Sequence, residues 1–141
     1  MIQYNFFDNA EFSYPDFFIQ QIIGLYRSQR WWDGPDNEKH VIRIIKGSHC
    51  FVIAVLNSEE IVGMGRSISD GASDAYIQDV TVKKNYRGQG IGTRIVRMII
   101  NRLQKDGIFW IGLIAEKNYH GFYEPIGFKQ MSDSIPMIFK P

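Results

Sequence analysis

The fold is decided by the stretch Asp79-Val80-Thr81-Val82-Lys83-Lys84-Asn85-Tyr86-Arg87-Gly88-Gln89-Gly90-Ile91-Gly92, residues 79–92 of the chain. It opens as a short apolar strand, passes through a glycine-rich loop and enters a strongly periodic helix that continues to about residue 105. Glycines let the backbone approach an anion closely, and the free N–H groups and dipole of a helix N-terminus attract that anion. The stretch therefore predicts a phosphate-bearing ligand lying across residues 88–93.

Two common nucleotide-binding loops do not fit this spacing. A P-loop requires two glycines five residues apart, followed by Lys and then Ser or Thr, and this loop has no such Lys. A dinucleotide fingerprint requires a third glycine three residues after the second, where this chain has Thr93. It also requires an acidic residue about 20 positions further on, and Glu116 at that distance follows a later strand.

The loop instead resembles the acyl-CoA pyrophosphate loop of the GNAT N-acetyltransferase superfamily, which consists of Arg or Gln followed by closely spaced glycines. Residues 87–92 fill that pattern without a gap, and Val82 and the pair Tyr86-Arg87 match the strand end and the aromatic-Arg pair that precede it. Further on, Gly121-Phe122-Tyr123-Glu124-Pro125-Ile126-Gly127-Phe128 resembles the family's second signature, Phe-Tyr followed by Gly-Phe. The likeness extends over about residues 48–131, and two motifs at a family-like separation are far more specific than one glycine loop.

The bulk composition limits the function classes. A chain of 141 residues fits one domain, residues 1–141, and 45% hydrophobic with 22% charged residues is typical of a soluble protein. The net charge of +1 gives no basic field that would indicate a nucleic-acid partner. The N-terminus lacks the pattern of a signal peptide and no apolar run approaches the length of a membrane span, so we expect a cytoplasmic protein without membrane contact.

Cysteine and histidine usage gives no sign of a disulfide or a metal site. The single cysteine, Cys50, lies in the apolar run 50–56 and is predicted to be a small buried hydrophobe rather than a nucleophile. The three histidines, His40, His49 and His120, show no metal-ligand spacing, so no metal is expected.

Hydrophobic periodicity predicts a single α/β (α+β) domain. Helices are expected from about Ser13 to Ser28 with Pro15 in the first turn, from about Asn37 to Lys46, from the glycine loop to Lys105, and around Tyr119 to Glu124. Strands are expected at 2–7, 50–56, 60–69, 75–82, 108–115, 128–132 and 136–139, the last two as a hairpin. Strands 75–82 and 108–115 flank a helix and should be parallel. We therefore expect a mixed, mostly antiparallel sheet of about six or seven strands, with a central parallel pair and helices on both faces.

The resemblance implies acetyl-CoA as co-substrate, lying where strand 75–82 diverges from the next parallel strand. The residues that would contact it by this likeness are Val80, Thr81, Val82, Arg87, Gly88, Gln89, Gly90, Ile91, Gly92, Thr93 and Phe122. The backbone N–H of Val80 would stabilise the developing oxyanion, and the phenol of Tyr123 would protonate the departing thiolate. A tyrosine that merely packs in the core is the alternative for Tyr123.

The general base departs from the family's pattern. Many relatives carry Glu nine residues ahead of the loop Arg, where this chain has Gln78, which cannot titrate. The adjacent Asp79 points to the opposite face of the strand unless a β-bulge turns it. We expect deprotonation through water ordered by Gln78 and Tyr76, and a merely structural Gln78 is the alternative.

The acceptor site and the partners are the least determined part of the sequence. The resemblance implies that Trp31 and Trp32, with Gln78, line the acceptor pocket, although aromatic residues between two helices are more often core. The leading function is acetyl transfer to a primary amine of a small molecule or protein, and the alternative is a non-catalytic acyl-CoA-binding sensor. The basic face of helix 91–105 lacks interleaved stacking aromatics, so nucleic-acid binding is not indicated. The predicted terminal hairpin offers edges for a homodimer.

Overall fold

The computed structural model describes residues 1–7, 16–32 and 38–141. Its elements, in chain order, are β1 (Ile2–Phe6), α1 (Asp16–Ser28), α2 (Glu38–Gly47), β2 (Cys50–Leu56), β3 (Glu60–Ser69), β4 (Asp74–Val82), the 3₁₀ turn η1 (Lys84–Tyr86), α3 (Ile91–Lys105), β5 (Trp110–Gly112), α4 (His120–Tyr123) and the 3₁₀ turn η2 (Glu124–Ile126). The strands form one sheet in the order β1-β2-β3-β4-β5, antiparallel up to β4 and parallel between β4 and β5. The predicted fold class is confirmed.

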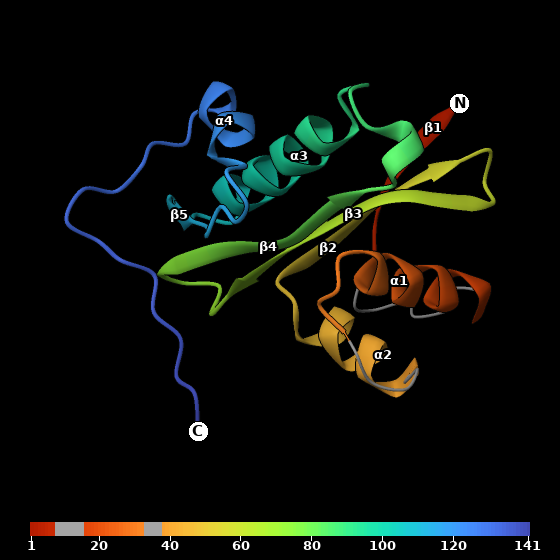
Figure 1. Cartoon of the computed structure of the whole chain (residues 1–141), viewed down its shortest axis with the longest axis horizontal. Helices are drawn as coiled ribbons and strands as arrows, with labels where there is room; N and C mark the ends of the chain where they lie inside the picture. The colour runs from red at the N-terminus through yellow and green to blue at the C-terminus, as the bar shows by residue number, and fades with distance from the viewer. Residues whose placement is uncertain (8–15, 33–37) are drawn as a thin grey trace.

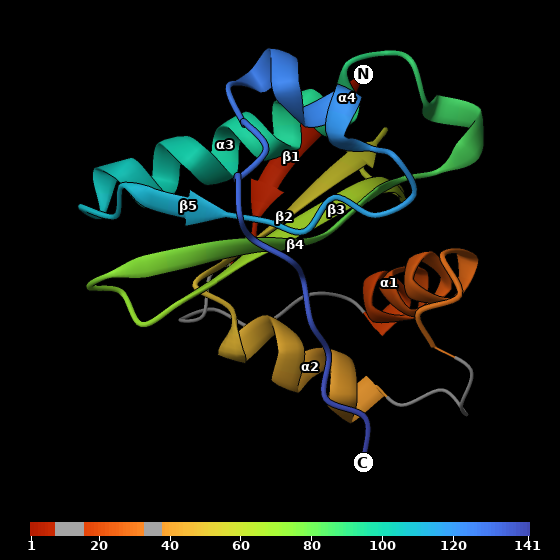
Figure 2. The ribbon, with the colours of Figure 1, turned by 60° about the vertical axis from the view of Figure 1, so that its left-hand side comes forward.

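Helices cover both faces of this sheet, as predicted. Figure 1 shows α3 on one side and α1 and α2 on the other, and Figure 2 shows the same layers from a second direction. Alternate residues of β2 divide between the two cores: the side chains of Phe51, Ile53 and Val55 join the cluster under α1 and α2, whereas Val52 and Ala54 join the cluster under α3. Both faces of β2 are buried, so its run of seven apolar residues is explained by two packed layers.

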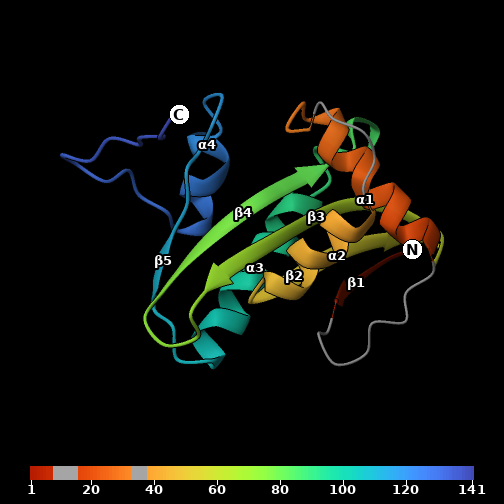
Figure 3. The ribbon, with the colours of Figure 1, turned by 90° about the horizontal axis from the view of Figure 1, so that it is seen from below.

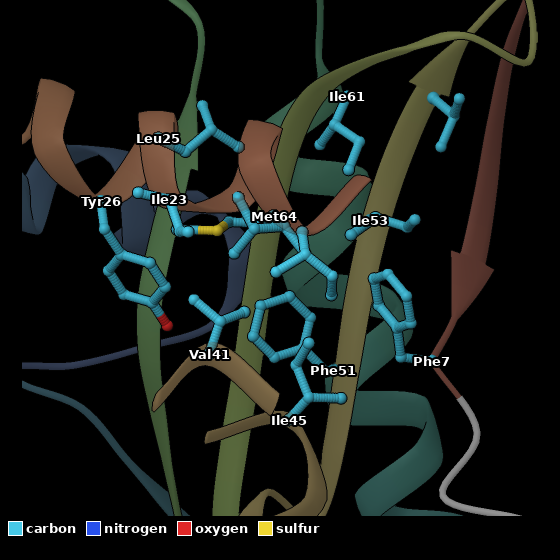
Figure 4. Packing of buried hydrophobic residues seen from close by; sticks show 13 residues of the cluster. Phe7, Ile23, Leu25, Tyr26, Val41, Ile45, Phe51, Ile53, Ile61 and Met64 are labelled. Atoms are coloured by element: carbon cyan, nitrogen blue, oxygen red, sulfur yellow. The ribbon is translucent and has the colours of Figure 1, made fainter. Parts of the chain in front are cut away.

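The core under α1 and α2 is built from aromatic and branched side chains. Figure 4 shows Phe51, Ile53 and Met64 of the sheet facing Ile23 and Val41 of the helices. All five side chains are buried, at 2% exposure or less. This packing fixes α1 over the sheet and so holds the segment that follows it, residues 29–32, near the carboxyl end of β4.

On the opposite face, two glycines of β3 let α3 lie close to the sheet. A Cβ atom at Gly65 would be 2.8 Å from Ile95 Cγ2 and 3.3 Å from Ile99 Cδ1, and one at Gly63 would be 3.0 Å from Ile95 Cδ1. At both positions the side chain of Ile95, or the helix that carries it, would have to shift to admit a Cβ atom. The close approach positions the N-terminus of α3 directly beyond the end of β4.

Several predicted boundaries are confirmed. Strands β2 and β3 have the predicted bounds, β4 begins one residue earlier than predicted, and α3 ends at Lys105. The predicted burial of Cys50 is also confirmed: the thiol lies 3.2 Å from Ser67 Oγ, and burial raises its pKa. The predicted first turn at Ser13–Pro15 and the predicted start at Asn37 lie outside the described residues.

The C-terminal part of the sheet was predicted wrongly. Residues 128–141 form no helix or strand, so the expected hairpin at 128–132 and 136–139 is absent. The strand expected at 108–115 is limited to Trp110–Gly112, and it is not covered on both faces, since Phe109 is 73% and Ile114 is 65% exposed. The described residues therefore contain five strands rather than six or seven, and the parallel pair lies at the edge of the sheet rather than at its centre. A β pattern in sequence forms a strand only where a neighbouring strand and a covering layer are available.

Candidate active site

A β-bulge in β4 opens the site. Between two paired positions of the β3–β4 ladder, β3 contributes only Gly65, whereas β4 contributes both Asp79 and Val80. Asp79 takes a left-handed conformation with φ of 59°, which turns the strand and re-aims its side chains. The bulge thus removes Asp79 and Val80 from regular pairing. Strand alternation alone predicted that Asp79 points to the face opposite that of Gln78, and this alternation is interrupted at the bulge.

The two parallel strands separate in the same region. The β4–β5 ladder pairs only residues 74–76 with residues 110–112, so β4 beyond Tyr76 has no partner on that side among the described residues. This confirms the predicted divergence of the two strands. Two cavities occupy the space that the separation leaves.

The first cavity, of about 460 Å³, extends from the end of β4 over the glycine loop to α4. Its lining consists of Gln29, Val80, Thr81, Val82, Tyr86, Arg87, Gly88, Gly90, Ile91, Gly92, Thr93, Tyr119, Phe122 and Tyr123. The loop takes its shape from Gly88 and Gly90, whose φ values of 79° and 83° are ones that favour glycine, and Gly90 is the N-cap of α3. The N-terminus of a fifteen-residue helix therefore faces the cavity.

This cavity fits a ligand that carries phosphates. No acidic residue is among the described residues that line it, whereas backbone N–H groups and Arg87 are present. An added side chain at Gly92 would be crowded, because its Cβ atom would be 3.1 Å from Phe122 Cζ. Residues 80–82 and Phe122 provide an apolar wall next to the phosphate cradle, which suits the mixed apolar and anionic character of an acyl-CoA.

The glycine loop is anchored to the sheet by polar contacts. The Glu60 carboxylate accepts hydrogen bonds from Lys83 Nζ at 2.9 Å and from the Tyr86 hydroxyl at 3.0 Å. These two donors lower the pKa of Glu60. Arg87 Nε donates to the carbonyl oxygen of Val82 at 2.9 Å, so its guanidinium is held at the mouth of the cavity rather than extended into solvent.

A second cavity, of about 300 Å³, adjoins the first one on the side of β5. Its lining consists of Gln29, Trp31, Tyr76, Ile77, Gln78, Asp79, Val80, Leu113, Ile114, Glu116, Lys117, Tyr119 and Tyr123. Four of these residues, Gln29, Val80, Tyr119 and Tyr123, also line the first cavity. The two cavities therefore meet at Val80 of the bulge and at Tyr123 of α4.

Tyr123 is held at this junction by aromatic packing. Its ring contacts those of Phe122 and Phe128, with centroid distances of 4.8 Å and 5.7 Å. Burial raises the pKa of Tyr123 to about 12, because the phenolate would lose solvation. The phenol is therefore protonated at physiological pH, and Tyr123 lines both cavities.

The second cavity contains a carboxylate in a fixed network. Asp79 Oδ2 accepts hydrogen bonds from the Tyr26 hydroxyl at 2.7 Å and from Arg66 Nε at 2.5 Å. The second arm of the same guanidinium, Arg66 Nη2, lies 3.3 Å from Gln78 Oε1. Burial and the neighbouring Asp79 charge raise the pKa of Tyr26, which keeps its hydroxyl protonated as a donor. Arg66 and Tyr26 were not predicted from the sequence, since they come from other elements and carry no local motif.

The structure brings most predicted site residues together but not all of them. Of the predicted CoA contacts, all except Gln89 line the first cavity. Of the predicted acceptor residues, Gln78 and Trp31 line the second cavity with Tyr76, whereas Trp32 does not. The Trp32 ring instead stacks on Tyr26, with centroids 4.5 Å apart and an interplanar angle of 1°.

Two further features of the described residues bear on function. None of the helices in the described ranges is long and apolar enough to cross a membrane. No group of three or more His, Cys, Asp or Glu side chains in those same ranges is arranged to hold a metal ion.

The family of this chain follows from its sequence. Residues 6–128 match the acetyltransferase (GNAT) family, and the chain belongs to that family. It is similar to GCN5-related N-acetyltransferase 2, chloroplastic, of Arabidopsis thaliana, with 35% identity over 81 residues, 57% of this chain and 31% of that protein. It is also similar to the uncharacterized N-acetyltransferase ycf52 of Porphyra purpurea, with 28% identity over 124 residues, 83% of this chain and 71% of that protein. The chain thus spans less than a third of the first relative and most of the second.

Solved structures share the fold over the full length of the chain. A protein of unknown function and probable acetyltransferase from meticillin-resistant Staphylococcus aureus has a TM-score of 0.79 and 23% identity, covering 100% of both chains. A predicted acetyltransferase with acetyl-CoA from Clostridium acetobutylicum has a TM-score of 0.71 and 17% identity, covering 98% of this chain and 96% of that one. At these identities the likeness concerns the fold.

Proposed function

We propose that this chain is an acetyl-CoA-dependent N-acetyltransferase that acts on a primary amine of a small molecule or protein by direct attack. The proposal rests above all on the junction of the two cavities at Val80 and Tyr123. Transfer between two bound molecules requires their reacting atoms to meet, and a junction lined by a hydrogen-bond donor is a suitable place. The family membership and the acetyl-CoA named with one structural relative agree with this function.

The first cavity would hold acetyl-CoA. Backbone N–H groups of residues 88–93 and the Arg87 guanidinium would bind its phosphates, and the end of β4 with Phe122 would pack along its arm. Acetyl-CoA supplies the acetyl group as a thioester, and transfer to an amine forms a C–N bond, breaks the C–S bond and moves one proton from nitrogen to sulfur. The residues of this chain must therefore orient the thioester, stabilise the oxyanion and manage that proton.

Val80 and Tyr123 take the two electrostatic roles at the junction. The bulge takes Val80 out of regular pairing, so its backbone N–H is available to bond the carbonyl oxygen of the thioester. A single donor of this kind lowers the barrier by about 3 kcal/mol. Tyr123 acts as the general acid for the thiolate. Because its pKa of about 12 lies above that of a thiol, full transfer of its proton to the sulfur is uphill, so the phenol stabilises the departing thiolate chiefly as a hydrogen-bond donor. The proton that the amine releases through water replaces any proton that the phenol gives up.

Deprotonation of the acceptor amine runs through water ordered by Gln78 and Tyr76. Both side chains line the second cavity beside the carboxylate of Asp79. Asp79 attracts the ammonium form of the acceptor and, with the water, provides the path by which its proton leaves. Arg66 and Tyr26 keep that carboxylate in place, so its position does not depend on the acceptor.

Trp31 limits the acceptor side of the second cavity. It is 37% exposed and lines the cavity near Tyr76, so an aromatic or alkyl amine can pack against its ring. Trp32 supports this arrangement from behind by stacking on Tyr26.

Two measurements on the unmodified chain test the proposal. Acetyl-CoA, CoA and ATP are compared in thermal unfolding at about 100 μM, where a ligand present at about 100 times its Kd stabilises by about 2.7 kcal/mol. Thiol release is then followed across a panel of small amines and amine-bearing peptides. We expect stabilisation by acetyl-CoA and CoA but not ATP, and thiol release with some of the amines.

The two function classes separate in these measurements. Absence of stabilisation by acetyl-CoA contradicts both the enzyme and the alternative acyl-CoA sensor. Stabilisation without thiol release from any amine favours the sensor. A sensor deprotonates no amine, so it needs no titratable side chain at the position of Gln78.

A further inference from the structure

The turn between β5 and α4 contains a residue in an unfavourable backbone conformation. The Glu116 carbonyl oxygen accepts a hydrogen bond from the Tyr119 N–H at 2.9 Å, and Lys117 and Asn118 between them have φ values of 51° and 65°. Turns with positive φ at both central positions favour glycine and asparagine. Asn118 fits that preference, whereas Lys117 does not. Because strained residues cluster at functional sites, Lys117 is a candidate for a role in function.

This turn brings Lys117 to the second cavity. Figure 3 shows the chain diverging from β4 beyond β5, on its way to α4. Lys117 lines the second cavity together with Val80 and Tyr123, the two residues at which the cavities meet. It is the only lysine among the described residues that line either cavity. The cavity proposed to receive an acceptor amine therefore already contains a primary amine of the chain itself.

The Lys117 side chain is not held by another group. The residue is exposed, and its ammonium forms no ion pair or hydrogen bond with any residue that the structure describes. By contrast, the Asp79 carboxylate in the same cavity is held by Tyr26 and Arg66. A lysine amine lies at the end of a flexible four-carbon stem. Lys117 can therefore move within the cavity without first breaking an ionic contact.

We propose that Lys117 accepts an acetyl group from acetyl-CoA bound in the same chain, which makes it a modification site. This inference rests on the proposed acetyl transfer. The step forms a C–N bond between Lys117 Nζ and the acetyl carbon, breaks the C–S bond and moves one proton from nitrogen to sulfur, so CoA leaves as a thiol. An amine attached to the cavity wall has a high effective concentration. The reaction therefore proceeds when no external acceptor occupies the cavity.

Acetylation of Lys117 acts as a brake on the enzyme. It removes the positive charge of the side chain and leaves a larger, neutral amide in the cavity that receives the acceptor. The modified chain loses activity toward external amines. This loss occurs when acetyl-CoA is present and acceptors are scarce.

The first test incubates the full chain with isotope-labelled acetyl-CoA, without an added amine, and locates the label by peptide mass spectrometry. We expect label at Lys117 in the unmodified chain and none at that position in Lys117→Arg. Labelling of Lys117 should be slower by about tenfold or more in Tyr123→Phe, because the transfer loses its hydrogen-bond donor. Lys105→Arg is the matched control: Lys105 is exposed at the C-terminal end of α3 and lines neither cavity, so this variant should be labelled at Lys117 as fast as the unmodified chain. Equal rates in the unmodified chain and Tyr123→Phe would indicate chemical acetylation in solution and overturn the proposal.

The second test distinguishes transfer within one chain from transfer between chains. The labelling rate per chain should not change with protein concentration, because the donor and Lys117 share one pair of cavities. A rate that rises in proportion to protein concentration overturns the proposal. Thiol release across the amine panel reports separately on the proposed function. Release with external amines but no label at Lys117 removes this inference alone, whereas a chain that binds acetyl-CoA and gives neither label nor release removes both.

The third test measures the brake. The chain is incubated with acetyl-CoA alone, freed of it, and assayed with an amine that supports thiol release. We expect kcat/KM to fall in proportion to the fraction of chains labelled at Lys117, and Lys117→Arg to lose no activity through the same treatment. A chain that is fully labelled at Lys117 and keeps its full activity contradicts the brake.

Discussion

Tyr123 connects the two cavities, and its hydroxyl is the group that substitution can remove with least disturbance. Tyr123→Phe keeps the ring contacts with Phe122 and Phe128. We expect kcat to fall about 100-fold or more, because the departing thiolate loses its donor, while the Kd of acetyl-CoA changes little. Thiol-release kinetics and calorimetry measure the two quantities. Tyr4→Phe on β1, where the ring packs under Arg94, is the matched control, and an equal kcat for both variants would contradict the assigned role.

The raised pKa of Tyr123 predicts a specific dependence on pH. The phenol titrates near pH 12 rather than near 10, so the donor persists throughout the working range. We expect kcat to rise with pH as the acceptor amine loses its proton, without a decline caused by Tyr123 up to about pH 10. A decline with an apparent pKa near 9 that disappears in Tyr123→Phe would show that the phenol is not buried as described.

The same shift has a consequence for stability. The folded-state pKa of Tyr123 lies above its unfolded value, so its contribution to stability is fully present below about pH 10 and is lost as pH rises through 12. Unfolding of Tyr123→Phe should therefore be less sensitive to pH above 10 than that of the unmodified chain. Denaturant unfolding at a series of alkaline pH values measures this difference.

Asp79 combines a structural and an electrostatic role. Asp79→Asn keeps the shape but removes the charge from the bonds to Tyr26 and Arg66, and charge-assisted bonds contribute about 1.5–3 kcal/mol each. We expect a loss of about 1–3 kcal/mol in the free energy of unfolding and a higher KM for a cationic acceptor, with the KM for acetyl-CoA unchanged. Asp74→Asn, at the exposed start of β4, is the control and should change stability by less than about 0.5 kcal/mol.

A KM effect distinguishes the two roles of Asp79. If Asp79→Asn lowers stability but leaves the acceptor KM as it was, the carboxylate only anchors the bulge. Steady-state kinetics with one cationic and one neutral acceptor of similar size supply this comparison.

At the scale of elements, the glycines of β3 determine how closely α3 approaches the sheet. Gly65→Ala would place a Cβ atom 2.8 Å from Ile95 and should destabilise the fold by about 1–3 kcal/mol through overpacking. Gly24→Ala is the matched control, because no atom lies within 4 Å of its added Cβ and α1 is helical there. This variant should be more stable by about 0.5–1 kcal/mol. Denaturant midpoints at constant m-value measure both changes, and equal effects would show that α3 is not held as described.

The elements that were predicted correctly are those with a strong local signal. The seven apolar residues of β2, the glycine loop and the periodic stripe of α3 each specify their own conformation. A bulge at Asp79 was named from the sequence only as a condition, because a bulge depends on how β3 and β4 align and neither strand specifies this alone. Without the bulge, strand alternation would place every later residue of β4 on the opposite face. The Asp79 network was missed for a related reason: its partners lie 13 and 53 positions away in the sequence.

At the scale of the whole molecule, two failed predictions concern the C-terminal part of the sheet. The run 108–115 was expected to be an inner strand and the segment 128–139 a hairpin, and both sequences are apolar enough for those roles. Within the described residues, β5 pairs with β4 alone and residues 128–139 pair with no strand, whereas an inner strand has a neighbour on each side. These predictions failed because an apolar β pattern in the sequence does not specify whether a neighbouring strand is available to pair with it.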